Sequence, residues 1–269
     1  MTLLQAIILS IIEGLTEYLP ISSTGHMIIT SWMMGIEDND FVKNFEVIVQ
    51  FGAILSVLSL YWRRFLVDWS FYAKLFVAFI PTAVLGFLVK NKIDQILGDV
   101  RVVAWALLIG GVILIGVDKF FAKQEAEARG RDDKAELDNM TYVQSGLLGV
   151  IQCLAFIPGV SRSAATIVGG LGMRLSRKAA AEFSFFLAVP TLSAAAAYKT
   201  LKILPSITSE QIPLLLVGNA VSFIVGAITI KAFVGYLSRR GFFAFGVYRI
   251  IVGAIILVLL AMGQDVKMG

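Results

Sequence analysis

Long apolar stretches separated by short polar segments constrain this chain more than any other feature. Six of them approach the roughly 20 residues that a helix needs to cross a bilayer, and they fall at residues 45–62, 71–89, 102–117, 179–198, 212–233 and 242–262. Charged residues make up only 16% of the chain and hydrophobic residues 58%, whereas soluble domains are about a quarter charged. The sequence therefore predicts a single all-α integral membrane domain over residues 1–269, with about six transmembrane helices.

Two further apolar segments are interrupted by proline. The first runs through Pro20, and the second covers residues 142–157 and ends at Pro158 and Gly159. Neither can cross a membrane simply, so we interpret both as re-entrant helix-loop-helix segments. Irregular backbone of this kind is tolerated at membrane depth only where it is buried in protein or lines a polar cavity. The sequence therefore predicts two loops inside the membrane region.

The two halves of the chain resemble each other, which indicates an internal duplication. Residues 1–118 form the first half, residues 119–140 a polar linker expected on the cytoplasmic side, and residues 141–269 the second half. The segment Leu-Pro-Ile-Ser-Ser-Thr before Gly25 aligns with Ile-Pro-Gly-Val-Ser-Arg before Ser163. This alignment pairs Thr24 with Arg162. Three spans per half predict an inverted-topology repeat, in which the second half is inserted upside down relative to the first.

The distribution of basic residues predicts how the chain is oriented. Lysine and arginine are more numerous in the proposed cytoplasmic segments than in the proposed outer segments, and such residues accumulate in cytoplasmic loops. Both termini are therefore expected on the outer side. The first re-entrant segment would then open outward and the second inward, with their tips meeting near the middle of the membrane.

The first interrupted segment carries an unusual density of reactive side chains. Glu13 and Glu17 lie four residues apart, so a helix would place both on one face, where like charges repel. A proton or a cation should neutralise them in an apolar setting. Three hydroxyl residues and the sole histidine of the chain follow Pro20, and these are Ser22, Ser23, Thr24 and His26. The alternative, a solvent-exposed helix cap, fits poorly with the apolar sequence on both sides.

The second interrupted segment supplies a cation. Arg162 lies between Ser161 and Ser163, and its planar guanidinium suits a phosphate or carboxylate. A helix is expected to start between Ser161 and Ala164, which would direct free N–H groups and the positive helix end at the same place. Two other interpretations stay open: Arg162 reaches the membrane interface, or it pairs with Glu182.

These motifs resemble a known family. Glu-Gly-Leu-Thr-Glu-Tyr-Leu-Pro-Ile-Ser-Ser-Thr-Gly-His at 13–26 and Pro-Gly-Val-Ser-Arg-Ser at 158–163 are similar to the two signature blocks of the undecaprenyl-diphosphate phosphatases of the bacitracin-resistance (BacA) type. A third block at 181–190 is also similar, and the resemblance covers essentially the whole chain. One residue departs from the pattern: Ala164 stands where the family usually has glycine, and its methyl group could weaken phosphate binding.

The resemblance implies a bacterial inner-membrane enzyme that removes one phosphate from a C55 polyprenyl diphosphate, so that the carrier lipid is reused in cell-wall synthesis. It implies catalytic roles for Glu13, Glu17, His26 and Arg162. Ser23 is either the nucleophile or a ligand of a phosphate oxygen while water attacks, and His26 is the expected acid or base. Substrate contacts are expected from hydroxyl groups of both motifs, namely Ser22, Thr24, Ser161 and Ser163.

A divalent cation is the expected cofactor, because carboxylate oxygens of Glu13 and Glu17 suit Mg²⁺ or Ca²⁺. In the alternative, one of the two glutamates acts as general base. The expected partners are the lipid substrate and the bilayer. Nucleic acid is not expected at a net charge of +4, and a lone Cys153 excludes an internal disulfide. The oligomeric state stays open, with a homodimer as one option.

A secondary transporter is the main alternative function. Inverted repeats, broken helices and intramembrane charges are typical of transporters, and a flippase for polyprenyl phosphate would need the same anion-binding groups. A dual role, hydrolysis with return of the lipid across the bilayer, also fits the sequence. The pairing of Ser23 with His26 favours the enzyme, since an anion transporter has less need of either side chain.

Overall fold

The computed structural model describes residues 1–66, 69–97, 99–128 and 130–262; for residues 90–97 it describes only the backbone. The end of the predicted second half, at 263–269, therefore lies outside the described residues. The described part of the chain is helical, with no strand. Its α-helices are α1 (Leu3–Thr16), α2 (Ser23–Met33), α3 (Asp40–Ile48), α4 (Gln50–Leu60), α5 (Trp69–Leu97), α6 (Val100–Phe120), α7 (Ala122–Ala128), α8 (Asp133–Asp138), α9 (Tyr142–Gln152), α10 (Arg162–Gly172), α11 (Arg177–Ile203), α12 (Gln211–Arg240) and α13 (Phe243–Ala261).

The prediction of about six transmembrane helices is confirmed by length and composition. Six segments of the described chain are long and apolar enough to cross a membrane: Asp40–Leu60, Trp69–Val89, Val100–Phe120, Arg177–Ser206, Gln211–Arg240 and Phe243–Ala261. The first of them combines α3 and α4. The chain is therefore a multi-pass membrane protein.

The two proline-interrupted segments fold as pairs of short helices, α1 with α2 and α9 with α10. Both pairs begin with the same local structure. Thr2 caps α1 and Thr141 caps α9, and each forms a capping box with the glutamine three residues later, Gln5 or Gln144. The boxes satisfy backbone N–H groups that the first turn of a helix leaves free.

The second helix of each pair also begins alike. Ser22 caps α2 at φ 72° and Ser161 caps α10 at φ 78°, a left-handed conformation that is uncommon for serine. Each hydroxyl accepts a hydrogen bond from the backbone N–H three residues later, that of Gly25 or Ala164. These caps pair Ser22 with Ser161, so Arg162 corresponds to Ser23. The sequence alignment that paired Arg162 with Thr24 is wrong by one residue, because the second loop has one residue more between its proline and its cap, Gly159 and Val160 against Ile21 alone.

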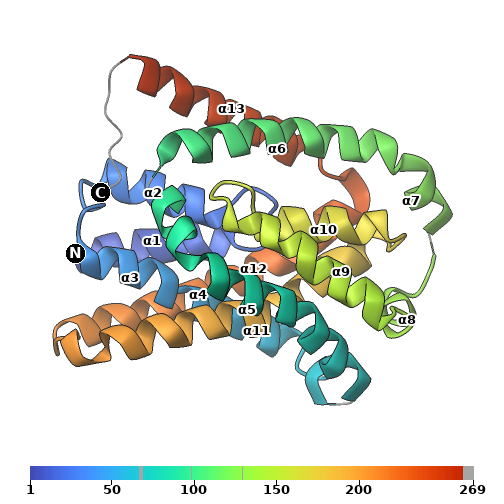
Figure 1. Cartoon of the computed structure of the whole chain (residues 1–269), viewed down its shortest axis with the longest axis horizontal. Helices are drawn as coiled ribbons and strands as arrows, with labels where there is room; N and C mark the ends of the chain where they lie inside the picture. The colour runs from blue at the N-terminus through green and yellow to red at the C-terminus, as the bar shows by residue number, and fades with distance from the viewer. Residues whose placement is uncertain (67–68, 98, 129, 263–269) are drawn as a thin grey trace.

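Helix contacts between the halves come in matching pairs. α1 packs on α12 and α9 packs on α5, while α4 packs on α12 and α11 packs on α5. Two further contacts join corresponding helices, α6 with α13 and α4 with α11. In Figure 1, the N-terminus and the end of α13 lie at one end of the bundle, and α7 and α8 of the linker lie at the opposite end. The two short pairs lie between these ends and pack against the long helices.

Close packing between α4 and α12 depends on Gly52. A Cβ atom at this position would meet the main chain of Asn219 on α12. We expect Gly52→Ala to lower the free energy of unfolding by about 1–3 kcal/mol, the usual cost of overpacking, seen as a lower melting temperature in detergent. Gly235→Ala is the control, because nothing lies within 4 Å of its added methyl group. Equal melting temperatures for the two variants would contradict this account of the packing.

Candidate functional site

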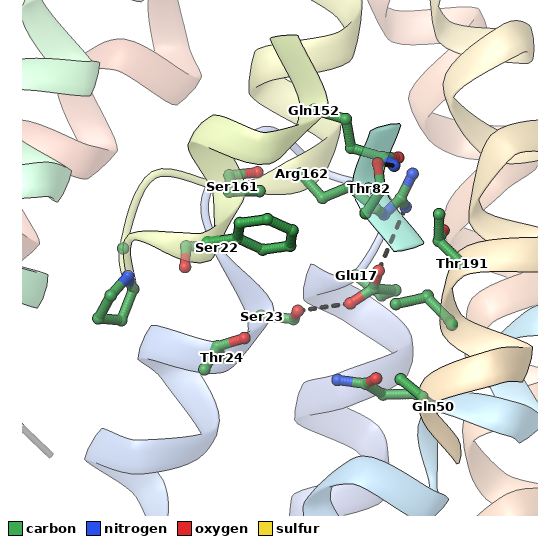
Figure 2. A pocket seen from close by; sticks show the side chains of 16 residues that line it. Glu17, Ser22, Ser23, Thr24, Gln50, Thr82, Gln152, Ser161, Arg162 and Thr191 are labelled. Carbon is green, nitrogen blue, oxygen red and sulfur yellow. Dashed lines mark hydrogen bonds and ion pairs between the residues drawn. The ribbon is translucent and has the colours of Figure 1, made fainter. Parts of the chain in front are cut away.

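A cavity of about 220 Å³ lies where the two short helix pairs meet. Its walls come from six parts of the chain: the α1–α2 loop, the start of α2, α4, α5, the segment from α9 to α10, and α11. The polar lining residues are Glu17, Ser22, Ser23, Thr24, Gln50, Thr82, Gln152, Ser161, Arg162 and Thr191. Figure 2 shows these side chains directed into one space between the loops and the long helices. The irregular backbone of both loops thus borders a polar cavity inside the protein.

The centre of the cavity is an ion pair between the two motifs. Arg162 Nη2 lies 3.2 Å from Glu17 Oε1, although the residues are 145 positions apart. The other carboxylate oxygen, Oε2, accepts a hydrogen bond from Ser23 Oγ at 2.5 Å. Figure 2 shows both interactions as dashed lines. Glu17 therefore joins the hydroxyl of one motif to the guanidinium of the other.

Arg162 is held from a third element. Its Nη1 donates to the carbonyl oxygen of Ser184 on α11 at 2.7 Å and lies 3.3 Å from the Ser184 hydroxyl. Thr166, one turn further along α10, donates to that same hydroxyl at 2.7 Å. The Nε atom of Arg162 is buried and has no partner among the described residues. The Nε–H group is thus a donor that the described residues leave unused.

The start of α10 adds to this positive character. α10 begins at Arg162, as the sequence predicted, and α2 begins at Ser23. The partial positive charge of a helix N-terminus favours anions. Both helices start at the cavity, so its loop side is suited to a negatively charged group.

Four hydroxyl residues predicted to bind substrate divide into two groups. Ser22, Thr24 and Ser161 line the cavity. Ser163 does not line it; its hydroxyl donates to the carbonyl oxygen of Leu19 at 2.7 Å and lies 3.0 Å from Ser161 Oγ. Ser163 therefore ties the second loop to the first.

His26 lies away from the cavity lining. Its Nδ1 is 2.7 Å from the carbonyl oxygen of Ser22, and its Nε2 is 2.7 Å from the hydroxyl of Tyr248 on α13. The two rings stack, with centroids 5.5 Å apart. The structure thus places the histidine one turn after Ser23, between the first loop and α13.

Glu13 is fully buried one helical turn before Glu17, and it does not line the cavity. Both of its carboxyl oxygens lack a hydrogen-bond partner in the described part of the chain. A buried carboxylate without partners is costly, so a proton or a cation is needed there. This fits the sequence expectation for the glutamate pair.

Sequence reasoning missed four polar residues of the cavity. Gln50 and Gln152 are neutral amides on apolar helices, and Gln152 Nε2 donates to Thr82 Oγ1 at 2.7 Å. Thr82 and Thr191 each follow a proline inside a long helix, Pro81 in α5 and Pro190 in α11. Proline frees a backbone carbonyl in the preceding turn, and the repeated Pro-Thr pair in long apolar helices is a signal that could have revealed them.

Ala164 occupies the position that departs from the family pattern. It is buried, its N–H donates to Ser161 Oγ at 3.2 Å, and it does not line the cavity. The methyl group therefore has no direct contact with the space where a phosphate would lie.

Comparison with known proteins shows the family of the chain. The family described as bacitracin resistance protein BacA matches residues 6–255. A protein of Bdellovibrio bacteriovorus named undecaprenyl-diphosphatase is 60% identical over 268 residues, covering 100% of both chains. Proteins with the same name from Porphyromonas gingivalis and Aquifex aeolicus are 48% and 42% identical, each over at least 95% of both chains. The chain belongs to the BacA family.

Proposed function

We propose that this protein is an undecaprenyl-diphosphatase, which hydrolyses the C55 polyprenyl diphosphate to the monophosphate and inorganic phosphate. One observation carries the proposal: Arg162, Glu17 and Ser23 form a connected buried group beside a cavity. Relatives with this name cover nearly the whole chain. Phosphoryl transfer depends mainly on positioning and charge stabilisation, and this group supplies both.

Arg162 has the clearest role. Its unpartnered Nε and the start of α10 would bind the non-bridging oxygens of the terminal phosphate. These groups would stabilise the negative charge of the phosphate while the anhydride bond breaks. Donors fixed in advance for such charge are the largest source of catalysis in many enzymes. The bonds to Ser184 and Glu17 hold the guanidinium in place, so little reorganisation is needed.

Glu17 and Ser23 would carry out the proton transfer. In one route, Ser23 Oγ attacks the terminal phosphorus while its proton passes to Glu17, the anhydride P–O bond breaks, and water then hydrolyses the phosphoserine. In the other route, Glu17 takes the proton of an attacking water and Ser23 binds a phosphate oxygen. Both routes give the lipid monophosphate and phosphate. His26 would hold or pass a proton from its position beside Ser22.

Glu13 and Glu17 would hold a divalent cation, Mg²⁺ or Ca²⁺. The two unpartnered oxygens of Glu13 suit such an ion, and Mg²⁺ commonly uses one or two carboxylates together with substrate phosphates. The described chain has no group of three or more histidine, cysteine or acidic residues suited to a metal, so substrate oxygens would have to supply further ligands. A bound ion would neutralise the diphosphate.

We also propose that the two halves form an inverted repeat with re-entrant pairs α1–α2 and α9–α10, in a bacterial inner membrane with both termini outside. The matching caps at Ser22 and Ser161 and the matching helix contacts support the repeat. The N-terminus and the end of α13 lie at the end of the bundle opposite to the linker helices α7 and α8, which supports their placement on opposite sides of the membrane. Accessibility of single cysteines introduced into α8 and before α1, in a Cys153→Ser background, tests it.

The first experiment measures phosphate release from undecaprenyl diphosphate by the purified protein in detergent. Release is expected with Mg²⁺ or Ca²⁺ and should fall to background after chelation with EDTA, because the diphosphate then lacks its counter-ion. Full release after exhaustive chelation would contradict the metal proposal. Folded protein that binds the lipid without releasing phosphate would instead favour the transporter, which the relatives' names do not support. The particle mass in the same detergent tests the homodimer.

A further inference from the structure

Arg249 on α13 is buried in the middle of the bundle, outside the cavity lining. Its side chain has no accessible surface, and no carboxylate of the described chain forms an ion pair with it. A fully buried, unpaired guanidinium is costly and is a sign of function at membrane depth. Arg249 lies outside the three sequence motifs, so no role was expected for it.

Backbone carbonyl groups from three segments surround this guanidinium. Nη1 donates to Pro20 and Val160, both at 3.0 Å. Nη2 donates to Gly159 at 2.8 Å, and the remaining bonds reach α6, from Nη2 to Ala106 at 2.9 Å and from Nε to Leu107 at 3.4 Å. All five N–H groups of the guanidinium can be used in this way.

The position of these carbonyl groups matters more than their number. Pro20 is two residues before the cap Ser22, and Val160 directly precedes the cap Ser161. Nη1 alone thus joins the first loop to the second. Gly110 on α6 leaves space for the side chain, since a Cβ atom there would meet the guanidinium.

We propose that Arg249 is a positioning residue, which fixes the first loop relative to the second and thereby sets the position of Glu17 and Ser23 relative to Arg162. The group does not touch the cavity, so it acts through the backbone of the loops. Lysine cannot replace it, because one ammonium lacks the planar fork that reaches two loops and α6 together. The inference rests on the proposed function only for its kinetic test.

The kinetic test compares Arg249→Lys and Arg249→Ala with Lys231→Gln, which removes a cation from an exposed position on α12. For Arg249→Lys we expect kcat to fall about 100-fold, as small misplacements of reacting groups do, with KM changed less than about threefold. Added guanidinium ion, but not ammonium, should restore part of the activity of Arg249→Ala. Unchanged kcat in Arg249→Lys, or loss explained entirely by less folded protein with no rescue, would overturn the proposal.

A second measurement does not depend on activity. Spin labels at Leu15 and Ile157, both exposed near the ends of the two loops, report the distance between them in a Cys153→Ser background. The distance distribution should broaden in Arg249→Ala and stay unchanged in Lys231→Gln. If the distance distribution in folded Arg249→Ala is as narrow as in the wild type, the proposal that Arg249 positions the two loops is overturned. Absence of phosphate release by the wild type would reject only the proposed function, because the distance would still test Arg249.

Discussion

Replacing Arg162 by lysine should reduce phosphate release at least about 100-fold, although the positive charge is kept. Removal of one fixed donor at a developing negative charge has effects of this size. Arg162 uses Nη1 for the Ser184 carbonyl, Nη2 for Glu17, and keeps Nε free. A lysine ammonium cannot occupy these three positions at once. It would therefore lose either the ion pair with Glu17 or the contact with the phosphate.

The matched control for this variant is Arg177→Lys. Arg177 forms an ion pair with Asp118 at 2.9 Å outside the cavity, so the same exchange there keeps the charge, leaves the site untouched and should change kcat/KM less than about threefold. Phosphate release and lipid binding are measured for both. Near-normal release by folded Arg162→Lys would show that charge alone suffices and that the planar fork has no catalytic role.

The centre of the site could be predicted from sequence because its residues carry chemical signals. Two glutamates, a hydroxyl cluster and an arginine are unexpected in apolar sequence, and the internal similarity placed them in corresponding loops. The predicted meeting of the two motifs is seen directly in the contact between Arg162 and Glu17. The pairing of Arg162 with Thr24 failed, because single-residue differences between two short loops leave no mark on an apolar pattern.

The rest of the cavity depended on helix packing, which sequence patterns do not specify. Gln50 and Gln152 carry no charge, and their approach to the site follows from how α4 and α9 cross their neighbours. The direction of His26 toward Tyr248 likewise depends on where α13 packs. Arg249 had a clear signal, a buried charge in an apolar helix, but its partners are backbone carbonyl groups. Such acceptors exist at every residue, so sequence cannot identify which ones are used.

Replacing Ser23 by alanine should lower phosphate release by about 10²-fold or more while lipid binding persists. The hydroxyl donates to Glu17 at 2.5 Å, so its loss removes either the nucleophile or a fixed ligand of the phosphate, and positioned proton transfer contributes about 10²–10⁴-fold in enzymes. Thr191→Val is the control. That hydroxyl also lines the cavity but already donates to Leu187 in its own helix at 2.7 Å, so its loss should change kcat much less.

The same variant separates the two chemical routes. If Ser23 attacks phosphorus, rapid acid quenching of the wild type with phosphate-labelled substrate should trap a labelled serine, and Ser23→Ala should retain only background release. If water attacks, no labelled protein forms, and the variant keeps slow but metal-dependent release because Glu17 still activates water.

Full activity in Ser23→Ala would contradict both routes, and Glu17 would then have to act with another hydroxyl of the cavity. Thr24 lines the same wall one residue further along α2, so the double variant with Thr24→Val identifies that case.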